Sequence, residues 1–205
     1  MEWIRKFIEA NNGEKIIFEA AQDQWYGDQY GIMDDLSQKF FNAKSREKDK
    51  LKFLEGNFNI AVHVRRAVII DGVVSPEDDA TKDARWLSND YYETALRNVL
   101  SCIKTSKPIS IYIFSTSSES EFLEFEKYGD VHFCSDMDEY SSFIHLAKSD
   151  LLITSKSSFS YKAGLISKGI KVAPENFWHG YPKIDSWILT DNSGNFEMES
   201  INLEI

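Results

Sequence analysis

The sequence predicts an α/β protein, in which a parallel sheet carries helices on both of its faces. From residue 59 onward, short apolar runs alternate with segments of helical periodicity, which is the pattern of consecutive β-α-β units. The apolar runs lack polar alternation, as strands that are buried on both faces do. With 205 residues, of which 42% are apolar, the chain has the size of one such domain.

Each element of this predicted fold follows from a local pattern. The expected strands are 59–64, 109–114, 131–134, 151–154 and 170–173. Apolar residues recur at three- and four-residue spacing between these strands, and they predict helices at 89–103, 119–128, 139–148 and 157–167.

The first part of the chain has a different pattern. We expect 1–58 to be a mainly helical segment ahead of the sheet domain at 59–205. An apolar stripe predicts a helix over 1–13, and the run 15–19 indicates a short strand. The charged run 44–52 is typical of the solvated face of a helix.

Composition argues against several classes of function. The net charge of −10 argues against nucleic acid as the main partner, because duplex binding needs a broad basic surface. No window approaches 18 consecutive apolar residues, and charges among the first ten residues exclude a secretory signal, so we expect a cytoplasmic protein. Cys102 and Cys134 give neither a disulfide framework nor a metal-binding spacing. Asp136-Met137-Asp138 is expected to begin a helix rather than to bind a metal.

Two strand ends carry groups that suit an anion. The run 59–64 leads into Arg65 and Arg66, whose planar guanidinium groups bind phosphate oxygens in bidentate fashion. The run 151–154 leads into a turn with Ser157 and Ser158 at the start of a helix, where backbone N–H groups and the helix dipole favour phosphate. Parallel strands bring their carboxyl ends to one crevice. Together the two ends predict a diphosphate site, and therefore a nucleotide or nucleotide-sugar.

Each of these residues also has a structural explanation. Strand-end arginines often form salt bridges at the surface, and serine is a favoured cap at the start of a helix. His63 lies two residues before Arg65 and therefore on the same face of the strand. A histidine in such a place is more often a core group than a catalytic one. The hypothesis therefore depends on the combination of the two strand ends.

The same segments resemble a known family. His63-Val64-Arg65-Arg66 is similar to the H-x-R-R motif of the fucosyltransferase superfamily with two Rossmann-like domains, the GT-B type, which includes the α1,2-, core α1,6- and bacterial nodulation enzymes. Ser155–Gly164 resembles the second motif of the α1,2 branch, S-S-F-S-W-W-G-A, and Ile170–Trp178 resembles its third, an apolar run into A-P-x-x-W/F. Order and spacing agree over 59–178, about 120 residues.

This resemblance implies a Rossmann-like donor-binding half that holds GDP-fucose. The implied reaction is an inverting transfer of fucose to a glycan hydroxyl, without a metal or another cofactor. Arg65 would contact the diphosphate and stabilise the departing nucleotide, with Arg66 supporting the site, and Asp136 or Asp138 would hold the guanine edge. The donor-binding residues implied in this way are His63, Arg65, Arg66, Ser157, Ser158, Phe159 and Asp138.

The loop after the arginines departs from the family pattern. The α1,2 branch continues with Gly-Asp, whereas here Ala67–Ile70 precede Asp71. Asp71 is the candidate for the general base, with Glu77, Asp78 and Asp79 as alternatives, although a solvated loop is the favoured explanation of all four. Arg85 is expected to pair with loop carboxylates or to return to the site.

Length is the second departure. Only 62 residues precede His63, where family members carry an additional domain. A missing N-terminal domain or a partner subunit would then complete the acceptor site. Trp25-Tyr26, Phe40 and Phe41 suit stacking against sugars, but packing explains them more simply. Two other hypotheses stay open: a nucleotide-binding module without turnover, and an unrelated α/β domain whose arginines are structural.

Overall fold

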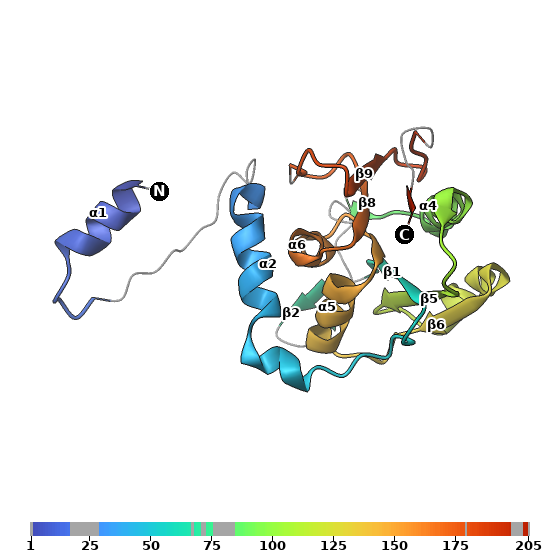
Figure 1. Ribbon diagram of the computed structural model, residues 1–205, viewed down its shortest axis with the longest axis horizontal. Coiled ribbons are helices and arrows are strands. Elements are labelled where there is room, and N and C mark those ends of the chain that lie inside the picture. Colours follow the sequence, from blue (N-terminus) through green and yellow to red (C-terminus); the bar gives the residue numbers. More distant parts are fainter. Residues whose placement is uncertain are drawn as a thin grey trace.

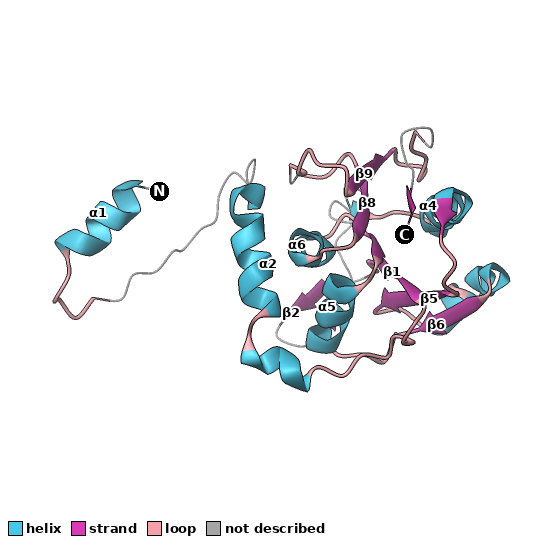
Figure 2. Cartoon of the chain, viewed as in Figure 1, coloured by secondary structure: helices cyan, strands magenta, loops and turns pink. Residues whose placement is uncertain are grey.

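The sheet has six parallel strands, which confirms the predicted fold class (Figures 1 and 2). The computed structural model describes residues 2–16, 29–66, 68–70, 73–75, 85–178, 180–197 and 203–204. The strand order is β6-β5-β1-β7-β8-β9, and every neighbouring pair is parallel. The strands are β1 (Phe58–Val64), β5 (Ile109–Ser115), β6 (Asp130–Phe133), β7 (Leu151–Ile153), β8 (Ile170–Pro174) and β9 (Trp187–Thr190).

The strand order reverses direction at the centre of the sheet. From β1 the chain builds outward through β5 to β6, and it then returns to the other side of β1 to build β7, β8 and β9. Ligands of open α/β sheets bind in the crevice beyond the carboxyl ends of the strands at such a reversal. The β1–β7 boundary is therefore the place where the fold itself favours a site.

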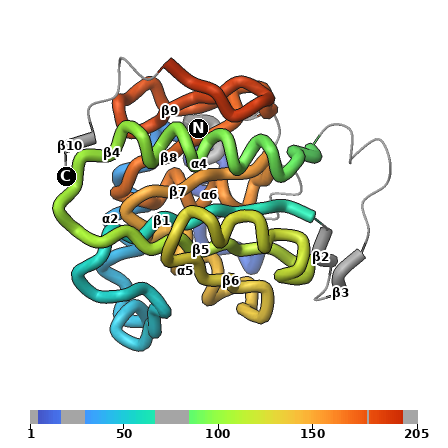
Figure 3. Tube along the Cα trace, turned by 90° about the vertical axis from the view of Figure 1, so that its right-hand side faces the viewer, coloured from blue at the N-terminus to red at the C-terminus, as the bar shows by residue number. Residues whose placement is uncertain are grey.

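Helices cover both faces of the sheet (Figures 1 and 3). On one face, α4 (Asn89–Cys102) packs Tyr92, Leu96 and Val99 into a core with the strands. On the other face, α5 (Glu139–Lys148) and α6 (Ser158–Ile166) enclose a second core, to which α5 contributes Leu146 and α6 contributes Ala163. The short helix α2 (Met33–Phe41) lies against α6, where the Ser37 hydroxyl donates to the Ile166 carbonyl at 2.7 Å.

The alternation of side chains along β1 decides which groups reach each face. Phe58, Ile60, Val62 and Val64 belong to the core under α4, whereas Ala61 belongs to the core under α5 and α6. Because successive strand residues point to opposite faces, His63 shares the face of Ala61. The same alternation, continued past the strand, assigns Arg65 to the face that α5 and α6 cover and Arg66 to the face of α4, where it bonds Asn89.

The seam between β1 and β7 is short. Three residue pairs join the two strands, from Ile60 opposite Leu151 to Val62 opposite Ile153. At its amino end the Asn59 N–H donates to the Asp150 carboxylate at 2.8 Å, and the Asp150 N–H donates to the Asn59 carbonyl at 3.0 Å.

The helix predicted at 119–128 is wrong in type. The chain forms two 3₁₀ segments there, η3 (Glu119–Glu121) and η4 (Leu123–Tyr128). Phe122 and Phe125 are both fully buried, and a 3₁₀ turn places residues three apart on the same side. Core packing of these two rings therefore overrides the α-helical pattern.

Smaller elements complete the described chain. β2 (Val68–Ile70) and β3 (Val73–Ser75) pair antiparallel, and β4 (Ile103–Lys104) pairs with β10 (Leu203–Glu204). The remaining segments before β1 are α1 (Glu2–Ala10), which stands apart from the sheet in Figure 1, η1 (Gln29–Ile32) and η2 (Lys44–Lys48). Of the strand expected at 15–19, residues 15–16 are irregular and 17–19 lie outside the described residues. In the described part of the chain, every helix is too short or too polar to cross a membrane.

Candidate functional site

A cavity of about 430 Å³ opens at the carboxyl ends of the central strands. Its volume falls within the ≈ 300–1,000 Å³ of typical small-molecule sites. β1, β5 and the starts of α5 and α6 all contribute to its wall. The residues that define it are His63, Arg65, Arg66, Arg85, Ser115, Thr116, Met137, Glu139, Ser142, Ser157 and Phe159, together with Val64 and Phe114.

The structure brings Arg65 and Ser157 to the same cavity. Ser157 is buried and caps α6, because its hydroxyl accepts a hydrogen bond from the Phe159 N–H at 3.3 Å. The positive end of the α6 dipole therefore lies at the wall that Arg65 also lines. Ser158 is the first residue of the helix and is half-buried beside this wall.

Arg66 serves a different purpose from its neighbour. Its guanidinium donates to the carbonyls of Arg65 at 3.0 Å and of Leu87 at 3.1 Å, and it also bonds the Asn89 side chain. The group lies 4.2 Å over the Trp86 ring, and only 4% of its side chain is exposed. Although Arg66 touches the cavity, its two terminal nitrogens tie the end of β1 to the start of α4. It thereby fixes the backbone that carries Arg65.

His63 lies in the cavity wall as a neutral imidazole. Burial, assisted by the Arg65 charge, lowers the pKa of His63 from 6.5 to about 3. Its ring centroid lies 5.5 Å from that of Phe159. The Nδ1 atom is buried and makes no hydrogen bond to any described residue. A neutral imidazole carries one donor and one acceptor, so His63 can offer a hydrogen bond to a ligand.

The lowered pKa of His63 predicts acid-sensitive folding. Between about pH 6.5 and 3 the His63 imidazole is protonated in the unfolded chain but neutral in the folded chain. The free energy of unfolding therefore falls as the pH falls through this range. The loss per pH unit is at most about 1.4 kcal/mol for one proton. Urea unfolding at pH 5 and pH 7 should therefore show a smaller difference for His63→Gln than for the unmodified chain. An equal pH dependence in both proteins would contradict this.

Asp138 is accounted for by helix capping. Its carboxylate accepts the Ser141 N–H at 2.9 Å and the Ser141 hydroxyl at 2.7 Å, and these bonds lower its pKa. The side chain is exposed and stands outside the cavity wall. The next residue, Glu139, is instead the acidic residue that lines the cavity. The sequence did not predict Glu139 as a site residue, because nothing in the pattern separates it from Asp136 and Asp138 at the start of the same helix.

Arg85 lies at the site, which is one of the two expectations for it. It lines the cavity, and its guanidinium lies 4.3 Å over the ring of Trp178. The proposed base, Asp71, and its alternatives Glu77, Asp78 and Asp79 lie outside the described residues, as do Trp25 and Tyr26.

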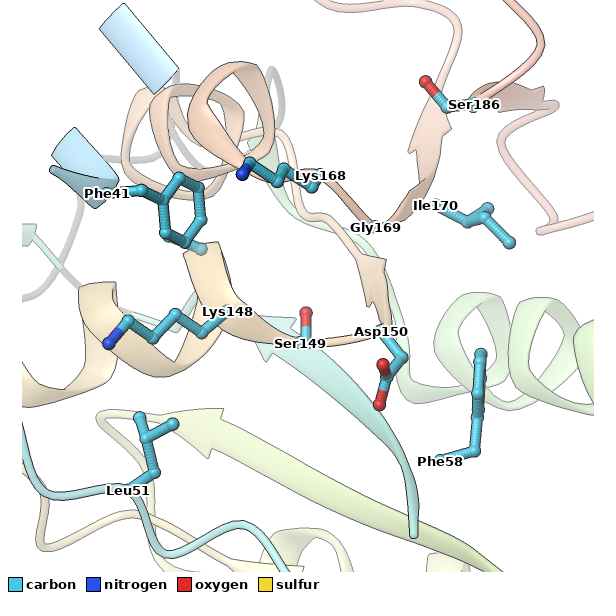
Figure 4. Close-up of a pocket in the computed structure, with 11 residues that line it drawn as sticks. Phe41, Leu51, Phe58, Lys148, Ser149, Asp150, Lys168, Gly169, Ile170 and Ser186 are labelled. Atoms are coloured by element: carbon cyan, nitrogen blue, oxygen red, sulfur yellow. The ribbon is translucent and has the colours of Figure 1, made fainter. Parts of the chain in front are cut away.

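Phe40 and Phe41 lie away from this cavity. Phe40 belongs to the core under α5 and α6, with its ring 6.3 Å from Phe143. Phe41 lines a second, larger cavity of about 620 Å³ at the opposite, amino-terminal edge of the sheet (Figure 4). Polar groups there have structural partners: Lys148 pairs with Asp49 at 2.9 Å, and Asp150 bonds the start of β1. We therefore place the candidate site at the smaller cavity.

Within the described ranges, no cluster of three or more acidic, histidine or cysteine residues is placed to hold a metal ion. The wall of the cavity brings together the Arg65 and Arg85 side chains, the amino end of α6 and a neutral imidazole.

Comparison with known proteins gives similarity only at the level of solved structures. No protein-family model and no curated protein matches the chain. A NodZ α-1,6-fucosyltransferase co-crystallised with GDP is similar at 16% identity and a TM-score of 0.42, covering 72% of this chain and 43% of that one. Fucosyltransferase NodZ from Bradyrhizobium gives 16% identity and a TM-score of 0.38, covering 67% and 42%. The chain therefore spans less than half the length of these enzymes.

Proposed function

We propose that this chain is the donor-binding part of a metal-independent, inverting glycosyltransferase that moves fucose from GDP-fucose to a glycan hydroxyl. One observation carries the proposal: Arg65 and the amino end of α6 line a single cavity at the β1–β7 reversal. The motif resemblance at His63–Arg66 and Ser155–Gly164 supports the choice of a GDP-sugar.

The anion-binding groups suit a diphosphate. A guanidinium forms paired, charge-assisted hydrogen bonds to phosphate oxygens, and the first N–H groups of a helix favour the same charge. When the glycosidic bond to the nucleotide breaks, negative charge builds on the β-phosphate. Fixed positive groups at that position stabilise the transition state more than the ground state. Arg65 is proposed to supply this charge in place of a metal, with Ser157 and Ser158 at the other side of the diphosphate.

Other residues of the cavity wall suit a purine base. Ser115 and Thr116 at the end of β5, and Glu139 and Ser142 on α5, line the cavity and carry hydroxyl or carboxylate side chains. The Watson–Crick edge of guanine carries N–H donors that a carboxylate accepts well. We therefore propose that Glu139, rather than Asp138, faces the guanine.

The proposed reaction also needs a general base and a binding site for the acceptor. Asp71 is proposed as the general base that takes the proton of the acceptor hydroxyl, and a further domain or a partner subunit is proposed to complete the acceptor site. His63 is assigned a hydrogen-bonding role, because an imidazole with a pKa near 3 is a weak base.

Calorimetry and thermal unfolding with a panel of nucleotides test the proposal. GDP and GDP-fucose should bind, whereas UDP and CMP should bind much more weakly. At 100 times its dissociation constant, a ligand stabilises the folded chain by about 2.7 kcal/mol. For a chain of this size that corresponds to a rise of about 5–10 °C in Tm. The absence of both heat and Tm shift with GDP would overturn the proposal.

Turnover separates the transferase from a nucleotide-binding module. With GDP-fucose, the transferase should release GDP by transfer or slow hydrolysis. Asp71→Asn should reduce that rate far more than it reduces donor affinity, since the base acts only on the acceptor. A near-normal rate would remove Asp71 from this role. Tight GDP binding without any turnover would favour the module.

A further inference from the structure

An exposed tryptophan, Trp178, with a partly buried phenylalanine beside it, lies next to the candidate site. The Arg85 guanidinium lines the cavity and lies 4.3 Å over the Trp178 ring. Trp178 is 59% exposed, and the Phe177 ring lies 5.4 Å from it. Adjacent aromatic side chains that leave apolar surface exposed beside a cavity are typical of the edge of a ligand site.

The order of the strands places Trp178 and the end of β5 on opposite sides of β1. β5 lies on one side of β1, and Ser115 at its end lines the cavity. Trp178 follows β8, which lies beyond β7 on the other side of β1. A nucleotide-sugar whose diphosphate lies at the β1–β7 reversal, with its base toward β5, would direct its sugar toward β8.

We propose that Trp178, oriented by Arg85, is the platform on which the sugar ring of the donor stacks. This inference rests on the proposed function and adds a specificity residue to it. An indole face attracts the polarised C–H groups of a pyranose, and Arg85 bound over the indole restricts how the ring turns. The group that stacks there is a hexose attached to a nucleoside diphosphate, and GDP alone lacks it.

Trp86 provides a matched control. It is also an exposed tryptophan, at 40%, and it also contacts an arginine, with Arg66 4.2 Å over its ring. Arg66, however, is tied to the start of α4, so Trp86 belongs to the anchoring contacts rather than to the sugar side.

The test compares GDP with GDP-fucose in calorimetric titrations of the unmodified chain, Trp178→Ala, Trp178→Phe and Trp86→Ala. Trp178→Ala should weaken GDP-fucose binding roughly 3- to 10-fold, the range expected for one aromatic stacking contact, and leave GDP binding unchanged. Trp178→Phe should restore most of the loss. Trp86→Ala should change the affinities for GDP and GDP-fucose by the same factor.

The outcomes keep the inference apart from the proposed function. If the unmodified chain binds neither ligand, the proposed function itself fails. If it binds both and Trp178→Ala changes neither affinity, the sugar platform is overturned while the nucleotide site stands. An equal loss for GDP and GDP-fucose would also overturn it, because Trp178 would then serve the nucleotide or the fold. Circular dichroism of each variant confirms that the comparison is made on folded protein.

Discussion

Arg65→Ala is expected to lower the affinity for GDP by about 100-fold while the protein remains folded. Charge-assisted hydrogen bonds contribute about 1.5–3 kcal/mol each, and 1.4 kcal/mol is a tenfold change in affinity. Arg65 follows the last residue of β1 and is only half-buried at the cavity wall, so its truncation removes little packing. Calorimetry with GDP, together with a urea unfolding curve, measures both quantities.

A lysine at the same position is the informative control for Arg65. Arg65→Lys keeps the positive charge but loses the planar fork, so its affinity for GDP should lie between those of the other two proteins. Salt should weaken the lysine variant more steeply, because its remaining attraction is that of a point charge. If Arg65→Ala binds GDP as tightly as the unmodified chain, Arg65 has no role in phosphate binding.

Arg66→Ala is expected to destabilise the fold by about 3 kcal/mol, since it removes the partner of buried carbonyl groups. The Leu87 and Arg65 carbonyls and the Asn89 side chain would each lose a charged donor. The nearby Glu121 carboxylate, at 3.8 Å, is half exposed and adds little to this loss. Tm should fall by about 6–12 °C for a chain of this length.

The contrast between the two arginines is the sharper result. At a temperature where it is still folded, Arg66→Ala should lose much less of its affinity for GDP than Arg65→Ala does. An Arg66→Ala variant with an unchanged Tm would contradict the anchoring contacts described for its guanidinium.

The sequence predicted most of the sheet because its strands are continuous apolar runs. The helix at 139–148 is confirmed at both ends, and the strands at 59–64 and 151–154 are confirmed to within one residue. β9 went unpredicted, because four residues without a following helix carry too little pattern. The 3₁₀ segments at 119–128 could not be foreseen, since they depend on how Phe122 and Phe125 meet the core.

The candidate site was predictable where it depends on local order along the chain. Parallel strand ends must meet, so Arg65 and Ser157 could be brought together from their positions alone. The fates of Arg66 and Arg85 depend on distant partners. Arg66 donates to the carbonyl of Leu87, 21 residues later, and the Arg85 guanidinium lies over the ring of Trp178. Neither helical nor strand periodicity relates residues so far apart in the sequence. Glu139 could not be distinguished from Asp138 for a similar reason. The two residues are neighbours at the start of α5, and only the three-dimensional structure shows that Asp138 caps the helix while Glu139 lines the cavity.

The short seam between β1 and β7 has a consequence for motion. Hydrogen bonds between Asn59 and Asp150 close the amino end of this strand pair, while its carboxyl end opens into the cavity. A diphosphate bound by Arg65 and the start of α6 would connect the ends of β1 and β7 at the cavity. It would thereby link two parts of the chain that are some ninety residues apart in sequence. Occupancy would then suppress sub-global opening of the whole sheet, and amide exchange along the central strands would slow even at positions that no ligand touches.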